Sequence, residues 1–253
     1  MKIKPLGVFS LLVFCALWQI LSIAGFLSPQ MFPPLTSIGW GLVELFREGL
    51  PPGFKLPGHA GESLIRVAAG YFAALLSAIP IGLLMGWSRT FETLASPLFE
   101  MIRPIPPLAF IPLAVLWFGI GIKSAGAVIF LGAFFPILLN TFAGVRSVDK
   151  VIIEASRILG IKEWQLIIKV LLPGALPSIL TGSMIAIGSA WMTLVAAEFV
   201  GVRSGYGLGH MIMTARDLQR TDLLIAGMAV IGFIGYALSF LLSLIERRLL
   251  KWR

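Results

Sequence analysis

The sequence has little charge and few side chains that bind metals or form disulfides. Only 13% of its 253 residues are charged and 58% are hydrophobic, whereas a soluble domain has about 25% charged residues. A single cysteine, Cys15, excludes an internal disulfide, and neither histidine belongs to a cluster of cysteines, histidines and carboxylates large enough to predict a metal site. A chain of this length has no large soluble interior in which to bury so much apolar surface. The composition therefore excludes an ordinary cytosolic enzyme, a disordered regulator and a disulfide scaffold, and it favours a membrane protein.

Six apolar stretches are long enough to cross a bilayer, whose hydrocarbon core of about 30 Å needs about 20 apolar residues in a helix. The first stretch imitates a signal peptide, but it is longer than a usual apolar signal region and lacks a small-residue cleavage site, so we interpret it as a retained span. We predict an all-α integral membrane protein with six transmembrane helices, a first helix and its extracytoplasmic connection at 1–58, and a core of five helices at 59–253. The predicted spans are Leu6–Leu27, Leu64–Trp87, Leu98–Phe118, Ser124–Val145, Pro177–Val200 and Leu223–Ile245.

The basic residues predict the orientation of the chain in the membrane. With 20 Lys and Arg against 12 Asp and Glu, the net charge is +8, which in a soluble chain suggests nucleic-acid binding. Membrane proteins, however, carry excess Lys and Arg in their cytoplasmic loops. If the N-terminus is inside, the cytoplasmic segments hold 13 of the basic residues and the outside segments hold 7. The distribution favours cytoplasmic termini and a role for the charge in topology.

Glycines and prolines indicate where the predicted spans pack closely or break. Gly82, Gly86, Gly182 and Gly188 lie within spans, where small residues let helix backbones approach one another; a solute pathway is the alternative interpretation. Four prolines between Pro104 and Pro112 begin the third span. Because proline removes a backbone donor and disfavours helix before it, we predict that this span starts as a broken segment enclosed by protein.

The longest predicted cytoplasmic loop, 146–177, holds two short helices rather than a plain connection. We predict helices at Asp149–Leu159 and Lys162–Leu171, with Gly160 supplying a positive φ between them and Pro173 ending the second. Asp149 suits the first helix's start, where the helix dipole favours an anion. Apolar side chains share one face of that helix: Val151, Ile152, Ala155, Ile158 and Leu159. Such helices dock on a membrane surface, on the rest of the protein or in a partner's groove.

The loop resembles the signature of permease subunits of ATP-binding cassette importers. That signature reads Glu-Ala-Ala, three residues, Gly, nine residues, Ile, one residue, Leu-Pro. Here Glu154-Ala155-Ser156, Gly160, Val170 and Leu172-Pro173 keep every spacing, with Ser156 and Val170 as conservative departures. The resemblance extends over nearly the whole chain, from Pro33 to Arg253.

The resemblance implies a type I importer permease whose loop forms coupling helices. In this family the coupling helices sit in a groove on a cytoplasmic ATPase, and closure of the ATPase pair switches the pore between inward-facing and outward-facing states. The implied ATPase-coupling residues are Glu154 as polar anchor, Ala155 as packing contact, Gly160 as turn, and Ser156, Leu159 and Lys162. The chain has no phosphate-binding loop, so it needs no cofactor of its own and ATP-Mg belongs to the partner.

The implied partners are a second permease copy, two cytoplasmic ATPase subunits, an extracytoplasmic solute-binding protein and membrane lipid, with no nucleic acid. The implied location is the inner (cytoplasmic) membrane.

Four segments resemble the nitrate, sulfonate, taurine and bicarbonate branch of these permeases: Ser63–Val67, Arg103–Leu108, Leu116–Gly121 and Gly132–Thr141. The part after Glu198 is more similar to the sulfonate and taurine members. The resemblance thus implies import of a small anionic solute, a sulfonate or taurine first, with nitrate, bicarbonate or another small solute as alternatives.

Polar residues within or beside the spans are candidates for the translocation path, because a polar group in a span is costly without a function. An anionic solute favours Arg103 and disfavours Glu198, which we place near the outer end of its span, within reach of water. The path candidates are Arg103, Ser189, Trp191, Thr193 and Glu198.

No catalytic or metal-binding residues are predicted, and two other functions are weighed. An ion-gradient-driven secondary transporter is the first, but the sequence lacks the convincing internal repeat expected of one. An intramembrane serine protease using Ser183 or Ser189 with His210 is the second. Neither histidine falls in a span opposite those serines, so the arrangement needed to activate a nucleophile is missing.

Overall fold

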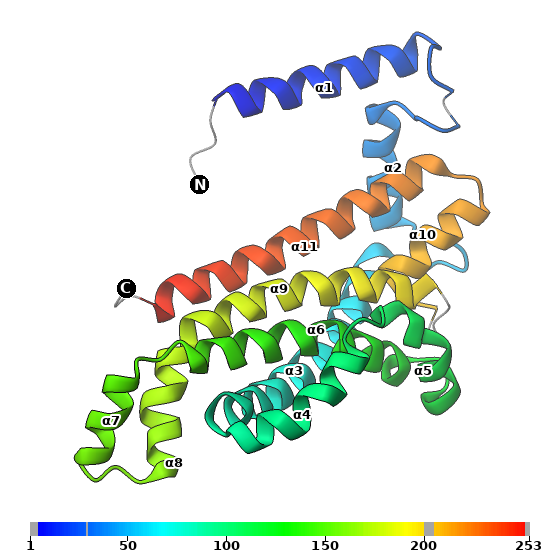
Figure 1. Ribbon diagram of the computed structural model, residues 1–253. Coiled ribbons are helices and arrows are strands. Elements are labelled where there is room, and N and C mark those ends of the chain that lie inside the picture. The colour runs from blue at the N-terminus through cyan, green and yellow to red at the C-terminus, as the bar shows by residue number, and fades with distance from the viewer. Residues whose placement is uncertain (1–4, 29, 200–204, 251–253) are drawn as a thin grey trace. The chain divides into compact units, whose positions relative to one another are not determined.

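Helices account for almost all of the regular structure in the computed structural model, which describes residues 5–28, 30–199 and 205–250 (Figure 1). Within those ranges there is no β-strand, which confirms the all-α prediction. The elements in chain order are α1 (Pro5–Ile23), α2 (Leu35–Arg47), α3 (Leu56–Trp87), α4 (Arg89–Ile102), η1 (Pro107–Phe110), α5 (Ile111–Phe118), α6 (Ile122–Arg146), α7 (Lys150–Ile158), α8 (Glu163–Leu166), the π-turn η2 (Ile167–Leu171), α9 (Leu172–Phe199), α10 (Leu208–Asp217) and α11 (Thr221–Leu249).

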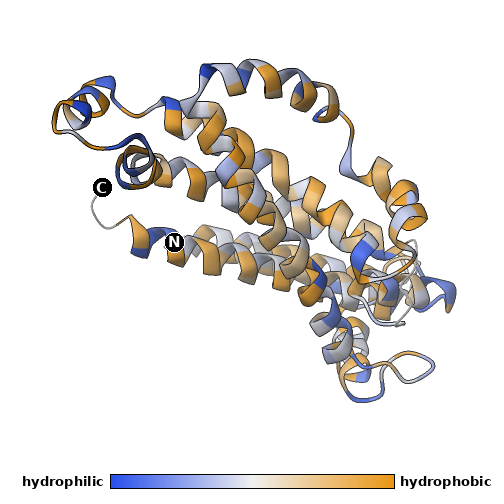
Figure 2. Ribbon diagram, turned by 90° about the horizontal axis from the view of Figure 1, so that it is seen from below, coloured by the Kyte–Doolittle hydropathy of each residue, from blue (hydrophilic) through white to orange (hydrophobic). Residues whose placement is uncertain are grey.

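Five helices of the described residues are long and apolar enough to cross a membrane. They are α1, α3, α6, the run from α8 to α9, and α11, and a sixth span results if α4 and α5 are counted as one broken span. Figure 2 shows these long helices largely in the hydrophobic colour, with hydrophilic residues mainly at helix ends and connections. The number of spans therefore agrees with the six that the sequence predicts.

The third span is broken where the prolines predict it. The chain bends by 83° between α4 and the η1–α5 segment. Pro104 and Pro106 lie in the break between Ile102 and Pro107, and neither has a backbone N–H to continue a helix. The prediction of a broken third span is confirmed. The expected enclosure of the break by protein is wrong for this chain alone, because residues 101–106 are exposed.

Three details of the prediction are wrong. Helix α3 begins at Leu56 instead of Leu64, and α2 and α10 are additional helices. Pro173 does not end a helix. It is the second residue of α9, which follows directly on the π-turn η2, where the N–H of Leu172 donates to the carbonyl of Ile167. The expected span end Val200 lies outside the described residues.

One compact unit comprises residues 1–63 and 204–234. In it Arg220 ties α2 to the start of α11: its Nη2 lies 2.7 Å from Glu44 Oε2 and 2.9 Å from Asp222 Oδ2. Hydrogen bonds to Asp222 and Glu44 hold the pKa of Arg220 above its usual value.

Hydrogen bonds also join the beginnings of α3 and α10 in this unit. The N–H of Gly207 donates to His59 Nδ1 at 3.0 Å, and the N–H of Leu208 donates to the Ser63 hydroxyl at 2.9 Å. The beginning of α3 thereby holds the beginning of α10.

The other unit comprises residues 64–203 and 235–253, and its core is the close packing of α6 on α9. Glycines permit this packing, since a Cβ on Gly182 would lie 2.6 Å from Asn140 Cβ and 2.9 Å from the Pro136 carbonyl. Gly82 and Gly86 of α3 face α6 in the same way. The packing role predicted for these three glycines is confirmed, but that of Gly188 is wrong, because nothing lies within 4 Å of its Cβ position.

Replacing Gly182 by valine is expected to destabilise this unit by about 1–3 kcal/mol, because the added methyl groups meet the backbone of α6. Gly188→Val is the matched control on the same helix, with open space at its Cβ position. Thermal unfolding of the purified protein in detergent measures both. An equal loss of stability in the two variants would show that the glycine contact between α6 and α9 is not tight.

Candidate functional site

The segment from α7 to α8 is a capped helix followed by a glycine turn. Asp149 Oδ1 accepts a hydrogen bond from the Val151 N–H at 2.9 Å, so the side chain satisfies a free donor at the start of α7. At the other end Gly160 has φ +77° and its N–H donates to the Arg157 carbonyl at 2.9 Å. The cap at Asp149 and the positive φ at Gly160 are both as predicted.

The inner side of this segment is anchored to the ends of α6 and α9. Ile153 packs against the buried cluster formed by Val145, Leu171, Ala175 and Ile179. Ser156 is buried and its hydroxyl donates to the Ile152 carbonyl at 2.7 Å, while Leu166 of α8 is fully buried. Ile153 thus places the inner side of α7 against residues of α6, η2 and α9.

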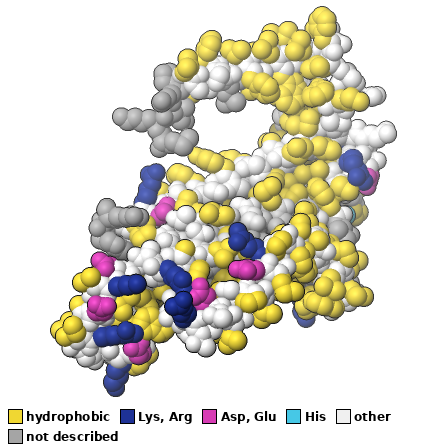
Figure 3. Space-filling view, in the orientation of Figure 1, with side chains coloured by type: hydrophobic (Ala, Val, Ile, Leu, Met, Phe, Trp, Pro, Cys, Tyr) yellow, Lys and Arg dark blue, Asp and Glu magenta, His cyan; other side chains and the backbone are white. Residues whose placement is uncertain are grey.

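The outer side of the segment presents large apolar side chains to its surroundings. Ile158 is 86% exposed and Leu159 is 80% exposed, and Val151, Ile152 and Trp164 are exposed too. Charged side chains gather around them over α7, α8 and the nearby ends of α4 and α6 (Figure 3). Contiguous exposed apolar side chains rimmed by charge are typical of a docking surface. We call Val151, Ile152, Ile158, Leu159 and Trp164 the docking face.

The six predicted coupling residues lie on this one segment but differ in exposure. Ser156 is buried beneath α7. The other five are exposed and available to a partner: Glu154, Ala155, Leu159, Gly160 and Lys162. The geometry thus divides the signature into exposed residues and one residue that supports α7 from within.

The sequence did not predict a contacting role for Arg157. The Arg157 guanidinium carbon lies 5.0 Å from the centroid of the Trp87 ring, and its Nε lies 3.3 Å from Glu163 Oε1. These contacts connect α7 with the end of α3 and with α8. The one related signal in the sequence is that Trp87 ends a predicted span, where an aromatic ring suits the membrane interface. That signal does not identify Arg157 as its partner.

The structure brings Ser189 and Thr193 next to each other but does not bring all five predicted path residues to one place. Arg103 is exposed after the end of α4. Thr193 donates to the Ser189 carbonyl at 2.7 Å, and both side chains lie near Gly132 of α6. Trp191 is buried and lies against Gly235 of α11. Ser189 and Thr193 therefore face α6, whereas Trp191 faces α11. The role of these residues in a path stays a prediction.

Glu198 forms a buried ion pair that the sequence did not predict. Arg66 Nη1 of α3 donates to Glu198 Oε1 of α9 at 2.7 Å, and the two side chains are 1% and 0% exposed. The expectation that Glu198 reaches water is wrong. It failed because the partner that buries Glu198 is Arg66 of α3, 132 residues away in the sequence, and no local pattern around Glu198 indicates it.

Comparisons with known proteins agree with this architecture. Residues 78–252 match the family described as the binding-protein-dependent transport system inner membrane component. A putative ABC transporter permease protein of Methanocaldococcus jannaschii is 43% identical, over 94% of this chain and 88% of the relative. The taurine transport system permease protein of Escherichia coli is 40% identical over 98% and 89% of the two chains. A putative aliphatic sulfonates transport permease protein of Bacillus subtilis is 39% identical over 95% and 85%.

A solved structure shares the fold. It is an inward-facing conformation of the MetNI methionine ABC transporter, with a TM-score of 0.66 and 22% identity over 76% of this chain and 94% of that chain. The helical architecture, the family match and the high coverage of the relatives lead to one conclusion. The chain belongs to the family of inner membrane components of binding-protein-dependent transport systems.

Proposed function

We propose that the chain is the permease subunit of an ATP-driven importer that takes up a small anionic solute. A second copy would complete the translocation path, two cytoplasmic ATPase subunits would bind the docking faces, and an extracytoplasmic binding protein would deliver the solute. Taurine or another sulfonate is the favoured solute, because relatives at 39–40% identity are named for taurine and aliphatic sulfonates. Bicarbonate, nitrate and other small solutes are the alternatives.

The observation that carries the proposal is the docking face. Ile158 and Leu159 are exposed at the tip of α7, whereas Ile153 fixes the other side of α7 to the core at the ends of α6 and α9. An apolar face unused by the chain itself suits a groove on a partner. Hydrolysis of Mg-bound ATP in the ATPase would drive transport. This chain would convert the movement of the ATPase into movement of α6 and α9.

The orientation follows from the same assignment. If the docking face binds a cytoplasmic ATPase, the α6–α7 junction lies at the cytoplasmic surface, and both termini are cytoplasmic as the basic residues predict. Coupling would then depend on Glu154, Ala155, Leu159, Gly160 and Lys162 as partner contacts, with Ser156 supporting α7 from within.

Uptake by reconstituted vesicles tests the function and its main alternative together. The vesicle membrane holds the permease with its ATPase and ATP on the inside, the binding protein is added outside, and ionophores collapse every ion gradient. We expect radiolabelled taurine to accumulate only when ATP is supplied. Uptake that vanishes with the gradients despite ATP would overturn the proposal in favour of a secondary transporter. ATP-driven uptake of bicarbonate but not taurine would leave the importer and overturn the solute.

A further inference from the structure

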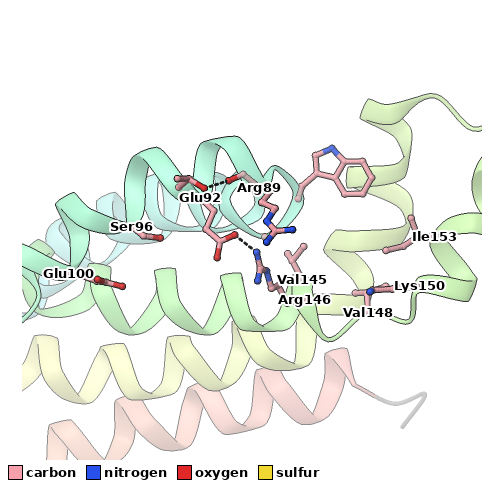
Figure 4. A pocket seen from close by; sticks show the side chains of 12 residues that line it. Arg89, Glu92, Ser96, Glu100, Val145, Arg146, Val148, Lys150 and Ile153 are labelled. Carbon is pink, nitrogen blue, oxygen red and sulfur yellow. Dashed lines mark hydrogen bonds and ion pairs between the residues drawn. The ribbon is translucent and has the colours of Figure 1, made fainter.

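A charged hollow of about 910 Å³ lies beside α7. Its walls are the junction of α3 and α4, the last residues of α6 and the first turn of α7. Val145, Val148 and Ile153 form an apolar part of the lining, and the remainder is mostly polar. Figure 4 shows the side chains of Arg89, Glu92 and Arg146 directed toward one another on one side of it, with Lys150 and Ile153 of α7 beyond.

Positive charge dominates the part of the hollow next to α7. Arg146 forms an ion pair with Glu92 and lies over the Phe142 ring, with 5.0 Å between its guanidinium carbon and the ring centroid. The Glu92 carboxylate therefore offsets one cation, and Arg89 and Lys150 supply further positive charge. Glu100 lies farther along α4, toward the opposite end (Figure 4). Clustered guanidinium and ammonium groups of this kind bind phosphate oxygens.

The hollow is continuous with an apolar surface on α4. Glu92, Ser96 and Glu100 of α4 line the hollow, whereas Leu94 and Leu98 on another side of the helix are 70% and 62% exposed. A second hollow of about 420 Å³ shares Arg89 and Thr93 with the first and reaches Leu94. A phosphate group in the first hollow would therefore have a direct route for attached acyl chains along α4.

We propose that this hollow binds the phosphate headgroup of an anionic phospholipid from the inner leaflet, with the acyl chains along Leu94 and Leu98. Trp87 and Arg146 end their helices beside it, at the depth where headgroups meet basic residues. The inference rests on the orientation given under the proposed function. Because Lys150 and Ile153 belong to α7, a bound lipid would brace the helix that carries the docking face.

Lipid retention by the purified full-length permease tests the site without an ATPase or transport. The protein is exchanged into detergent with equal amounts of phosphatidylglycerol and phosphatidylcholine, and retained lipid is counted by native mass spectrometry. We expect wild type to retain phosphatidylglycerol preferentially, and Arg89→Gln/Lys150→Gln to bind it about ten-fold or more weakly. Arg247→Gln/Arg248→Gln is the matched control, because it removes the same charge from exposed residues of α11 and is expected to retain lipid as wild type does.

Two further arms separate the possible occupants. Leu94→Ser/Leu98→Ser is expected to weaken lipid retention, whereas inorganic phosphate at millimolar concentration should not displace the lipid. Equal lipid loss in the control, unchanged retention in the Arg89/Lys150 variant, unchanged retention in the Leu94/Leu98 variant, or displacement by phosphate alone would each overturn the proposal. None of these results bears on whether the permease imports a solute with ATP. The lipid site can therefore be disproved without disproving the importer function.

Discussion

Replacing Glu198 by alanine is expected to destabilise the permease by about 3–5 kcal/mol, because it leaves the Arg66 guanidinium charged and buried without its carboxylate. The two side chains are 1% and 0% exposed and 2.7 Å apart, on helices α3 and α9. Keeping a cation out of water costs several kcal/mol, and after the replacement the Glu198 carboxylate no longer offsets this cost. Thermal or denaturant unfolding in detergent micelles measures the loss.

The chain offers a matched control in an exposed pair. Arg216 and Asp217 lie 2.8 Å apart with side chains 58% and 66% exposed, so Asp217→Ala is expected to cost no more than about 1 kcal/mol. Comparable losses in the two alanine variants would show that the Arg66–Glu198 pair is solvated in the native protein.

An apolar double variant separates the cost of a lone charge from the value of the pair. Replacing both members of a buried ion pair with apolar residues of similar volume is often neutral or stabilising. Arg66→Met/Glu198→Met is therefore expected to recover most of the stability lost in Glu198→Ala. If the double variant is stable but imports no solute, Glu198 or Arg66 acts in transport; if it imports normally, the pair serves the fold alone.

The sequence predicted what depends on local pattern. Helix positions follow from apolar stretches of bilayer length, the break in the third span from Pro104 and Pro106, and the loop geometry from Asp149 and Gly160. Each of these features is determined by residues within a few positions of one another, through backbone donors, helix dipoles and allowed φ values.

The sequence could not predict features that depend on contacts between distant residues. Arg66 and Glu198 are 132 residues apart, and Arg157 meets Trp87 across three intervening helices in the chain. A charged residue inside a span is costly unless a partner offsets its charge, and only the fold shows that Arg66 and Glu198 are such partners. Gly182 and Gly188 have the same residue type in the same helix, and only the position of α6 distinguishes them.

Replacing Leu159 by aspartate is expected to abolish ATP-driven uptake and to weaken ATPase association by about 100-fold or more. Burying a leucine side chain in a groove contributes about 1.5–3 kcal/mol, and an aspartate there adds the cost of removing a charge from water. Glu154→Lys and Gly160→Asp are expected to act in the same direction, since both residues are exposed on the same segment as Leu159. Co-purification of the ATPase and ATP-driven uptake in vesicles measure the two effects.

The folded state itself should be unaffected, which distinguishes lost docking from lost structure. Leu159 is 80% exposed, so its replacement removes little packing within the chain, and the unfolding temperature is expected to stay near that of wild type. Leu218→Asp is the control, because Leu218 is a half-exposed apolar residue that follows α10 and lies far along the chain from the docking face. If Leu159→Asp kept full ATPase binding, the tip of α7 would not be the contact, and the coupling role of its neighbours would fail with it. If it bound the ATPase normally but hydrolysed ATP without uptake, Leu159 would transmit movement instead of providing affinity.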